Sequence, residues 1–438
     1  MPTTLQLERM SSNAGAVGHL PSGKTVFVEG GAPGDVAEIE ITEEKSSFAN
    51  AKVVQVVEAG PDRIAPACPY GAACGGCPWQ HLAYEAQLAA KRSTVVEALV
   101  RTGGVPKEQA EELVAPVMGS KRQWGYRNKL ELGCGRDAAG RLEVGLRAEG
   151  THNLFTPQKC LLAHAPIQKA AKSLRGALRH LQGNDDLGIY RIGVRNSLRT
   201  KDTEIALWTP PSAFPRAAAT AILRDALRNT SVVRVLAAPD GARKVKRVEQ
   251  LNGKGCWGET LCDVDFLTSA PAFFQVNTAQ AEKLVETVID GLKLEEGELV
   301  ADLYSGGGTF SVPLALEGAQ VVAVESVGAS VRDLRRNAER AGVWIDVLGG
   351  DAERELPTLG RLDALVVDPP RAGLAKGMAE SIAAAHPHRM AYVSCNPQTL
   401  ARDIARLREV GLQLQHVQPV DLFPQTYHVE CVALLHQS

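Results

Sequence analysis

The 438-residue sequence predicts an α/β protein with three domains. From about residue 267 onward, strand-like apolar runs alternate regularly with helix-like runs, which indicates a Rossmann-like, largely parallel sheet over residues 266–438. Residues 1–60 contain short β-type runs separated by glycine and proline, a pattern typical of a small OB-like β-barrel. Residues 61–265 mix both patterns and include a helical stretch near residues 83–100, so we predict a central α+β domain there.

The composition argues against a secreted or membrane-spanning protein. The first ten residues lack the basic-then-apolar pattern of a signal sequence, and no apolar run approaches the roughly 18 residues that would cross a bilayer. We therefore expect a cytoplasmic protein that does not bind membranes. We also expect a monomer. In a reducing compartment, the nine cysteines favour metal binding and catalysis over disulfides.

Three cysteines, Cys68, Cys74 and Cys77, stand close together on a glycine-rich stretch. Such a loop can wrap thiolates around a soft metal centre, and Cys160 is the best candidate for a fourth ligand. Structural zinc sites usually use two closely spaced pairs, and Cys160 has no second cysteine beside it. The spacing therefore favours a four-iron cluster, with zinc as the alternative. The Cys-x3-Cys-x2-Cys spacing of radical S-adenosylmethionine enzymes is absent.

A local excess of positive charge marks residues 119–201, which carry 16 Lys and Arg against 6 Asp and Glu. The basic residues Arg122, Arg127 and Lys129 stand close to the aromatic residue Trp124. Basic side chains beside aromatic ones suit a nucleic-acid backbone with unstacked bases. We therefore predict a surface that faces RNA, and a merely solvated patch is the alternative.

A glycine-rich turn follows the first predicted strand of the C-terminal sheet. The strand at 298–303 leads into Tyr-Ser-Gly-Gly-Gly-Thr-Phe at 304–310, and the next strand ends in Glu325. In this layout the backbone approaches a ligand closely, and a carboxylate one strand further on can hold ribose hydroxyls. Ser311 occupies the position of the third glycine of a dinucleotide fingerprint, so S-adenosylmethionine fits the turn as well as NAD does. A turn required only for packing is the alternative.

Asp368 follows the buried-strand pattern of residues 362–367 and precedes two prolines. This position places its carboxylate at the C-terminal edge of the sheet, where ligands bind in doubly wound folds. The Asp-Pro-Pro sequence is similar to the signature of amino-methylating enzymes, but Arg371 stands where those enzymes need an aromatic residue.

Glu430 is the one carboxylate in the apolar terminal run from residue 427 to residue 435. Burial of this side chain should raise its pKa towards that of a usable proton acceptor. An edge-strand glutamate that faces water is the alternative.

Cys395 lies between a strand-like run at 390–393 and a helix-like run at 398–407. Pro397 suits the first position of that helix, and Asn396 suits the cap before it. The thiol would therefore lie beside unpaired backbone N–H groups and the positive end of a helix dipole, which lowers a thiol's pKa. We predict that Cys395 is a nucleophile, with a small buried core cysteine as the alternative.

Several motifs together resemble the RNA 5-methyluridine methyltransferase family, in particular its iron–sulfur members with an N-terminal TRAM domain. The resemblance spans most of the chain. Any one motif alone would be weak, but their combination is highly specific. The motifs are Cys-Gly-Gly-Cys-x-Trp-Gln at 74–80, Phe-Phe-Gln-Val-Asn at 273–277, Asp-Leu-Tyr-Ser-Gly-Gly-Gly-Thr-Phe at 302–310, Ser-Cys-Asn-Pro at 394–397 and Phe-Pro-Gln-Thr-x-His-Val-Glu at 423–430.

The resemblance implies a class I methyltransferase sheet, a TRAM barrel and a central iron–sulfur domain. It implies that Cys395 is the nucleophile and Glu430 the base. Two positions depart from the common family pattern, because Ser305 stands where cysteine is frequent and Thr309 where asparagine is frequent. The resemblance further implies that Gln275, Tyr304, Thr309, Glu325, Asp351 and Asp368 surround the methyl donor S-adenosyl-L-methionine, and that Cys68, Cys74, Cys77 and Cys160 bind a [4Fe-4S] cluster.

The implied reaction forms 5-methyluridine. The Cys395 thiolate adds to uracil C6, C5 takes the methyl group, and Glu430 removes the C5 proton so that the thiol can leave. The combination of cluster and TRAM domain favours large-subunit (23S) ribosomal RNA as the substrate, with the same chemistry on tRNA as the first alternative. A non-catalytic RNA-binding protein and, from the glycine turn alone, a dehydrogenase are the alternatives from other classes.

Overall fold

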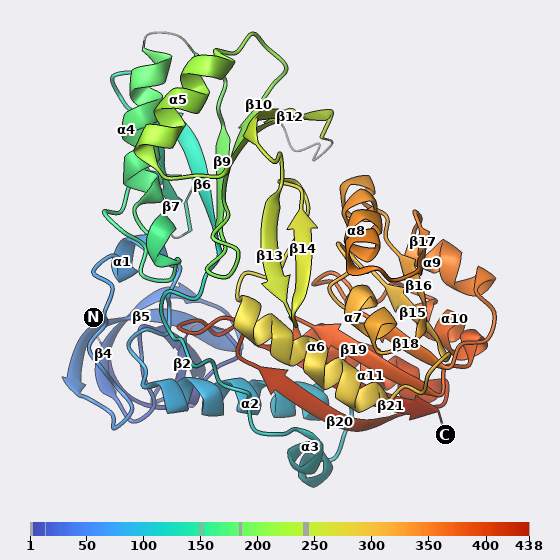
Figure 1. Ribbon diagram of the computed structural model, residues 1–438. Coiled ribbons are helices and arrows are strands. Elements are labelled where there is room, and N and C mark those ends of the chain that lie inside the picture. The colour runs from blue at the N-terminus through green and yellow to red at the C-terminus, as the bar shows by residue number, and fades with distance from the viewer. Residues whose placement is uncertain are drawn as a thin grey trace.

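The computed structural model describes residues 3–437 apart from residues 14, 149, 152, 184–185 and 240–244. Three bodies are packed against one another: an N-terminal barrel, a mixed sheet covered by two helices, and a C-terminal sheet with helices on both faces (Figure 1). Within the described residues, no helix combines the length and the apolar character that crossing a membrane would require.

The barrel is closed by five strands in the order β1-β2-β3-β5-β4, because β1 pairs with both β2 and β4. Alternate side chains such as Leu5, Leu7, Val26 and Val28 point inward and form its core, as the two-residue period of a strand requires. The sequence predicted the barrel and its last three strands but missed the first two. The strands are β1 (Thr3–Met10), β2 (Ala16–His19), β3 (Thr25–Glu29), β4 (Val36–Glu44) and β5 (Phe48–Glu58).

A seven-stranded mixed sheet follows, in the order β12-β11-β10-β9-β6-β7-β8. Helices α4 (Ala170–Gln182) and α5 (Arg216–Ala226) cover one face, where Leu174 and Leu223 pack against strand residues such as Ile192. The strands are β6 (Lys129–Arg136), β7 (Leu142–Arg147), β8 (Leu154–Phe155), β9 (Arg191–Asn196), β10 (Thr203–Thr209), β11 (Ser231–Leu236) and β12 (Arg247–Gly253), and a 3-10 turn η1 (Ala165–Ile167) precedes α4.

Part of the chain between the barrel and the mixed sheet packs on the C-terminal sheet. Helix α2 (Tyr84–Arg101) lies against helix α11 (Pro397–Glu409), and Val95 and Leu99 join the core of the C-terminal sheet. The short helix α3 (Lys107–Leu113) follows, and the chain then runs beside strand β20 (Leu412–Val420). Helix α1 (Gly71–Cys74) lies earlier, within the cysteine-rich loop. This arrangement brings residues 79–126 close to the loop at residues 421–429, between β20 and the last strand.

The C-terminal sheet has seven strands in the order β17-β16-β15-β18-β19-β21-β20. The first five are parallel, and β21 runs antiparallel to β19 and β20. Its parallel strands are near-continuous apolar runs because helices cover both faces. The remaining strands are β15 (Leu299–Leu303), β16 (Gln320–Val324), β17 (Ile345–Leu348), β18 (Ala364–Val367), β19 (Arg389–Ser394) and β21 (Glu430–Gln437).

Helices and one hairpin complete this body. The hairpin of β13 (Trp257–Leu261) and β14 (Val264–Thr268) turns through Cys262 and Asp263, which both have positive φ, and packs against α8. The helices are α6 (Thr278–Leu292), α7 (Ser311–Leu316), α8 (Gly328–Ala341), α9 (Ala352–Glu355) and α10 (Met378–Ala385), with a 3-10 turn η2 (Leu356–Thr358) after α9.

The topology brings five strand ends to one edge of the sheet. The C-terminal ends of the parallel strands β15 to β19 meet there, and β21 begins there because it runs in the opposite direction. Ligands bind at this edge in open α/β sheets. Residues 304–310, Glu325, Asp351, Asp368, Cys395 and Glu430 follow or begin these strands and therefore lie at this edge.

Candidate active site

The glycine-rich turn after β15 has the backbone of a close-approach loop. Tyr304 has a φ of 63°, which a non-glycine residue rarely adopts and which marks a strained, functional turn. Gly306 has a φ of 56° and open space where a Cβ would lie, so a ligand can approach its backbone. Gly308 is needed for packing, because a Cβ there would collide with Leu334 of α8. The turn therefore serves both packing and ligand approach.

Glu325 at the end of β16 is held in place by this turn. Its Oε2 accepts a hydrogen bond from Gly306 N at 2.9 Å, and its Oε1 accepts one from Val327 N at 2.6 Å. The carboxylate is almost fully buried. Each oxygen keeps acceptor capacity, so Glu325 can hold a pair of ribose hydroxyls beside the turn.

The other predicted donor residues differ in their surroundings. Asp351 follows β17, is exposed, and caps α9 by accepting a hydrogen bond from Glu353 N. Thr309 lies in the glycine-rich turn itself. Gln275 does not belong to the sheet: it lies between β14 and α6, its side chain is buried, and Asn128 donates to its backbone carbonyl at 2.9 Å.

Two buried aspartates near the turn have raised pKa values. Burial raises the pKa of Asp302, the penultimate residue of β15, to about 7, although Ser311 donates a hydrogen bond to it. Burial likewise raises the pKa of Asp368 to about 7. One oxygen of Asp302 is buried without a protein partner in the described part of the chain. The sequence analysis assigned no role to Asp302, although this residue opens the motif at 302–310 and is a carboxylate inside a buried strand.

Cys395 lies at the junction of β19 and α11, as predicted. Pro397 opens the helix, and the side chain of Asn396 caps it by accepting a hydrogen bond from Gln398 N at 3.1 Å. The strand, cap and helix start all follow from local sequence signals. The thiol is partly buried.

The predicted lowering of the Cys395 pKa is wrong for the protein without substrate. Burial, followed by the nearby carboxyl groups of Glu430 and Asp368, raises the pKa of the thiol to about 11. Only the charge of Arg371 and a backbone hydrogen bond oppose this rise. The helix terminus therefore does not decide the ionisation of the resting thiol, because desolvation and like charge outweigh it.

Glu430 is the first residue of β21 and is buried, with 5% of its surface exposed. Strand β21 lies between β19 and β20, so the alternative of an edge-strand glutamate facing water is excluded. Burial, followed by the charge of Asp368, raises the pKa of Glu430 well above its ordinary value, as the sequence predicted. Ser394 pairs with Cys431 in the β19–β21 ladder, so the next step of the register places Cys395 opposite Glu430.

Arg371 is a site residue whose role the sequence analysis missed. Its charge lowers the pKa of both Cys395 and Glu430, although larger effects raise them. Its backbone carbonyl accepts hydrogen bonds from Asn396 and Thr399 at the start of α11. The signal was its place directly after Asp-Pro-Pro, at the same sheet edge as Cys395.

The four predicted metal ligands, Cys68, Cys74, Cys77 and Cys160, line one cavity of about 220 Å³, together with Trp124 and other residues. Burial, followed by Cys160, Cys68 and Cys74, raises the pKa of Cys77, so these thiols lie within electrostatic range of one another. Four converging thiols are a donor set suited to an iron–sulfur cluster or zinc, whose positive charge would offset the mutual repulsion of the thiolates.

Among the residues that the structure describes, the four cysteines are not grouped as metal ligands. In the described residues, no three His, Cys, Asp or Glu side chains form a group that could hold a metal ion. The cluster and the central iron–sulfur domain therefore stay predictions.

The residues predicted to face RNA do not share one surface. Lys129 lies 2.6 Å from Glu131, its side chain is only 18% exposed, and burial lowers its pKa to about 8. Arg127 and Trp124 line the cysteine cavity. Arg122 is exposed and lines a second cavity of about 550 Å³ together with Lys121 and Lys283. Arg136, Arg141, Arg179 and Arg191 form ion pairs with acidic residues of the same segment, so these four guanidinium groups have protein partners, although the net excess of positive charge is unchanged.

The sheet order, the glycine-rich turn and the acidic end of β16 define a class I methyltransferase fold. Residues 263–347 and 359–438 match the family model of tRNA (uracil-5-)-methyltransferase, and residues 4–54 match that of the TRAM domain. An uncharacterized RNA methyltransferase of Gloeobacter violaceus is 36% identical over 99% of this chain and 96% of its own length. One from Halalkalibacterium halodurans is 33% identical over 98% of this chain and 95% of its own.

A solved structure shares the whole architecture. The tRNA (uracil-54, C5)-methyltransferase of Pyrococcus abyssi, in complex with S-adenosyl-L-homocysteine, is similar over 99% of this chain and 100% of its own, with a TM-score of 0.76 and 26% identity. The chain belongs to the RNA uracil-5-methyltransferase family and carries an N-terminal TRAM domain. It is accordingly an S-adenosylmethionine-dependent RNA methyltransferase.

Proposed function

We propose that this enzyme methylates C5 of a uridine in RNA through a covalent bond between Cys395 and C6 of the uracil. The observation that supports the proposal is the β19–β21 ladder, whose last pair is Ser394 with Cys431. Cys395 and Glu430 are the adjoining residues, within electrostatic range of each other, at the sheet edge that also holds the glycine-rich turn. A nucleophile, a base and a methyl-donor site side by side are the three parts that this reaction needs.

The steps follow from the weak nucleophilicity of uracil C5. The Cys395 thiolate adds to C6, the C5–C6 double bond opens, and an enolate forms. C5 of the enolate then bonds to the methyl group, which S-adenosylmethionine supplies in electrophilic form on its sulfonium. The Glu430 carboxylate accepts the C5 proton, the double bond forms again, and the bond between Cys395 and C6 breaks. The products are 5-methyluridine and S-adenosylhomocysteine.

The resting site holds protons that the reaction must move. The Cys395 thiol is neutral at pH 7, because its pKa is raised to about 11. Burial also favours the neutral form of Glu430, which has to be ionised when it acts as the base. Arg371 is the cation that favours both ionised forms, so we assign to it the stabilisation of the thiolate and of the carboxylate.

The reaction also requires access to the face of the uracil ring. C6 is unreachable within a base stack, so the target nucleotide must be flipped out at a cost of a few kcal/mol. Contacts with the rest of the RNA must offset this cost. The TRAM domain and the exposed Lys121 and Arg122 are our candidates for those contacts.

Cys68, Cys74, Cys77 and Cys160 would hold a [4Fe-4S] cluster. The methyl transfer moves no electron to or from the enzyme. The cluster would therefore have a structural role and not a redox role. It would join the loop at residues 68–77 to the segment around residue 160 and would fix the side chains that line the same cavity.

Two RNA classes are candidate substrates. The resemblance to family members that have both a TRAM domain and four cluster cysteines favours large-subunit ribosomal RNA as the substrate. The similarity of the whole chain to a tRNA (uracil-54, C5)-methyltransferase favours tRNA as the second candidate. Cytoplasmic location and a monomeric state belong to the proposal as well.

The direct test is methylation in vitro with labelled S-adenosylmethionine. Unmodified 23S ribosomal RNA and tRNA transcripts are incubated with the wild-type enzyme and with Cys395→Ala, and the nucleosides are analysed. We expect labelled 5-methyluridine in one RNA class with the wild type and none with Cys395→Ala. Label on another atom, on neither RNA class, or with Cys395→Ala at the wild-type rate would overturn the proposal.

A further inference from the structure

The loop that leads to Glu430 is held by hydrogen bonds from several other parts of the chain. Residues 421–429 connect β20 to β21, and Glu430 follows directly. Five successive backbone carbonyls of this loop accept hydrogen bonds from outside it, with distances between 3.0 and 3.1 Å. The donors to the carbonyls of residues 421 to 425 are, in order, Gln280 Nε2, Asn277 Nδ2, Lys91 Nζ, Tyr126 OH and Trp79 N.

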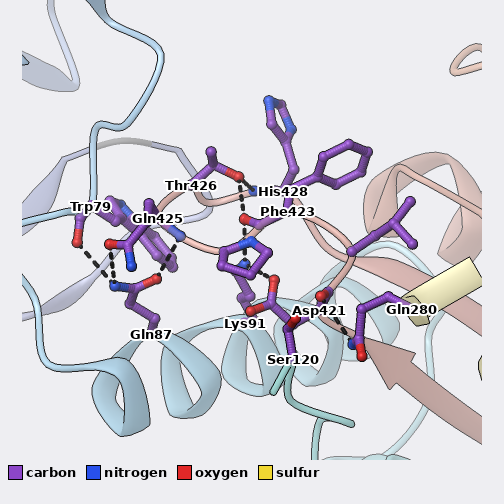
Figure 2. A network of polar contacts seen from close by, with 12 residues as sticks. Trp79, Gln87, Lys91, Ser120, Gln280, Asp421, Phe423, Gln425, Thr426 and His428 are labelled. Atoms are coloured by element: carbon purple, nitrogen blue, oxygen red, sulfur yellow. Dashed lines mark hydrogen bonds and ion pairs between the residues drawn. The ribbon is translucent and has the colours of Figure 1, made fainter. Parts of the chain in front are cut away.

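Gln87 of α2 is fully buried. Its side-chain amide contacts both Gln425 of the loop and Trp79 (Figure 2). Its Oε1 accepts a hydrogen bond from Gln425 N at 2.9 Å. Its Nε2 lies within hydrogen-bond distance of Gln425 Oε1, Trp79 O and Leu82 O, at 3.0 to 3.1 Å. The Gln87 amide therefore connects three parts of the chain: helix α2, the loop at residues 421–429, and the segment at residues 79–82 that follows Cys77.

We call the hydrogen bonds between Gln87 and Gln425 the clamp. The clamp holds Gln425 in a strained backbone conformation. Gln425 has a φ of 71°, a left-handed conformation that costs a non-glycine residue free energy unless its surroundings fix it. Beyond Gln425, Thr426 Oγ1 donates to Phe423 O at 2.8 Å and accepts from His428 N at 3.3 Å. The contacts at Gln425 thus continue through residue 428 to the start of β21.

We propose that Gln87 is a positioning residue for Glu430. This inference rests on the proposed function, in which Glu430 removes the C5 proton. A base works only when it lies within hydrogen-bond reach of the proton it takes, and a displacement of about 1 Å can cost on the order of 100-fold in rate. Gln87 fixes the loop that sets where β21 begins, and with it the position of the Glu430 carboxyl group.

The position of Gln87 separates this role from substrate binding. Its side chain has no exposed surface, so it cannot touch RNA. Its hydrogen bonds reach the loop before Glu430 and not the glycine-rich turn or Glu325. A change at Gln87 therefore affects proton removal, which comes after thiol addition and methyl transfer, and the methylated covalent intermediate should accumulate.

The test is Gln87→Glu, which keeps the shape of the side chain. The new side chain can still accept from Gln425 N. As a carboxylate it donates to neither Trp79 O nor Leu82 O, and as a neutral acid it donates to only one of them. We expect kcat to fall about tenfold or more, RNA and S-adenosylmethionine affinities to stay within about twofold of the wild type, and a methylated RNA–protein adduct to build up during turnover. The matched control is Gln182→Glu, which changes a buried glutamine in α4, in the separate core of the mixed sheet.

Several outcomes would overturn the proposal. These are a fall in kcat without an adduct, an equal adduct with Gln182→Glu, or wild-type behaviour of Gln87→Glu. If Gln87→Glu does not fold, Gln425→Ala tests the same clamp from the loop side and should also accumulate the adduct, and its failure to do so would overturn the role. An adduct with Glu430→Gln but not with the clamp variants defeats the positioning role alone. No adduct with Glu430→Gln defeats the base role of Glu430, which is the part of the proposed function on which this inference rests.

Discussion

The ammonium group of Lys91 lies 2.5 Å from a carboxylate oxygen of Asp421, and both side chains are fully buried. Tyr84 donates a hydrogen bond to the other oxygen of Asp421 at 2.7 Å. Burial lowers the pKa of Lys91, and the charge of Asp421 opposes that effect. The pair joins α2 to the loop that precedes the proposed base, across 330 positions of sequence.

Removing one partner of this ion pair should be costly. Lys91→Met leaves the Asp421 carboxylate buried without its cation, which typically costs about 3–5 kcal/mol of stability. The double variant Lys91→Met with Asp421→Leu removes both charges and should lose less than the single variant. Urea denaturation of the three proteins measures this. A double variant that is less stable than Lys91→Met would contradict this expectation and would show that the Asp421 carboxylate stabilises the fold without Lys91, as through its hydrogen bond with Tyr84.

The reactivity of Cys395 should rise with pH. Its raised pKa of about 11 leaves the thiol mostly protonated at neutral pH, and the thiolate fraction should increase about tenfold per pH unit between pH 7 and pH 9. Iodoacetamide labelling of the Cys395 peptide, quantified by mass spectrometry, measures this rate. A rate that is already level at pH 7 would support the helix-dipole expectation and contradict the effect of burial.

Asp302 should make the fold less stable as the pH rises. The folded-state pKa of about 7 lies above the ordinary value of 3.8, so the folded protein holds this proton more tightly than the unfolded chain does. The resulting stability is present below about pH 4 and is lost as the pH rises through 7. Asp302→Asn should remove this loss and gain on the order of 2–4 kcal/mol at pH 8. Thermal unfolding without methyl donor at pH 5 and pH 8 tests it, and an equal pH dependence in both proteins would contradict it.

The four cysteines should bind iron. Protein purified without oxygen should contain about four irons per chain and show broad charge-transfer absorption, whereas zinc would be colourless with one metal per chain. Cys160→Ser should lose the metal as readily as Cys74→Ser. Cys134→Ser serves as the control, because Cys134 does not line the cavity of the four cysteines. One zinc and no iron per chain, or a full cluster in Cys160→Ser, would contradict the assignment.

Local signals predicted the part of the site that local structure makes. Asn396 and Pro397 predicted the cap and the start of α11, and the strand-like run before Cys395 is β19 in the structure. The parallel alternation also fixed which strand ends share an edge, so Glu325, Asp368 and Cys395 were expected together. Glu430 was expected to be buried because its strand is otherwise apolar, and it is.

The rest depends on contacts that no local pattern carries. The pKa of Cys395 is set by Glu430 and Asp368, which reach it only through the folded sheet, so the helix signal alone gave the wrong direction. The clamp between Gln87 and Gln425 joins residues 338 positions apart, and a buried glutamine in an amphipathic helix looks like any other polar residue. Lys129 appeared to be a surface charge, because the sequence analysis did not assign a strand there. On β6, Lys129 and Glu131 stand two residues apart on one face and form an ion pair.

The most direct test of the covalent mechanism is the mass of the complex formed by Glu430→Gln with substrate RNA and S-adenosylmethionine. Thiol addition and methyl transfer precede the step that Glu430 performs, so this variant should stop with RNA bound to Cys395. Intact mass spectrometry under denaturing conditions should find one protein, one RNA and one added methyl group, with the crosslink on the Cys395 peptide. An unlinked RNA that already carries 5-methyluridine at the wild-type rate would contradict the role of Glu430 as the base, and a crosslink on any other residue would contradict the role of Cys395.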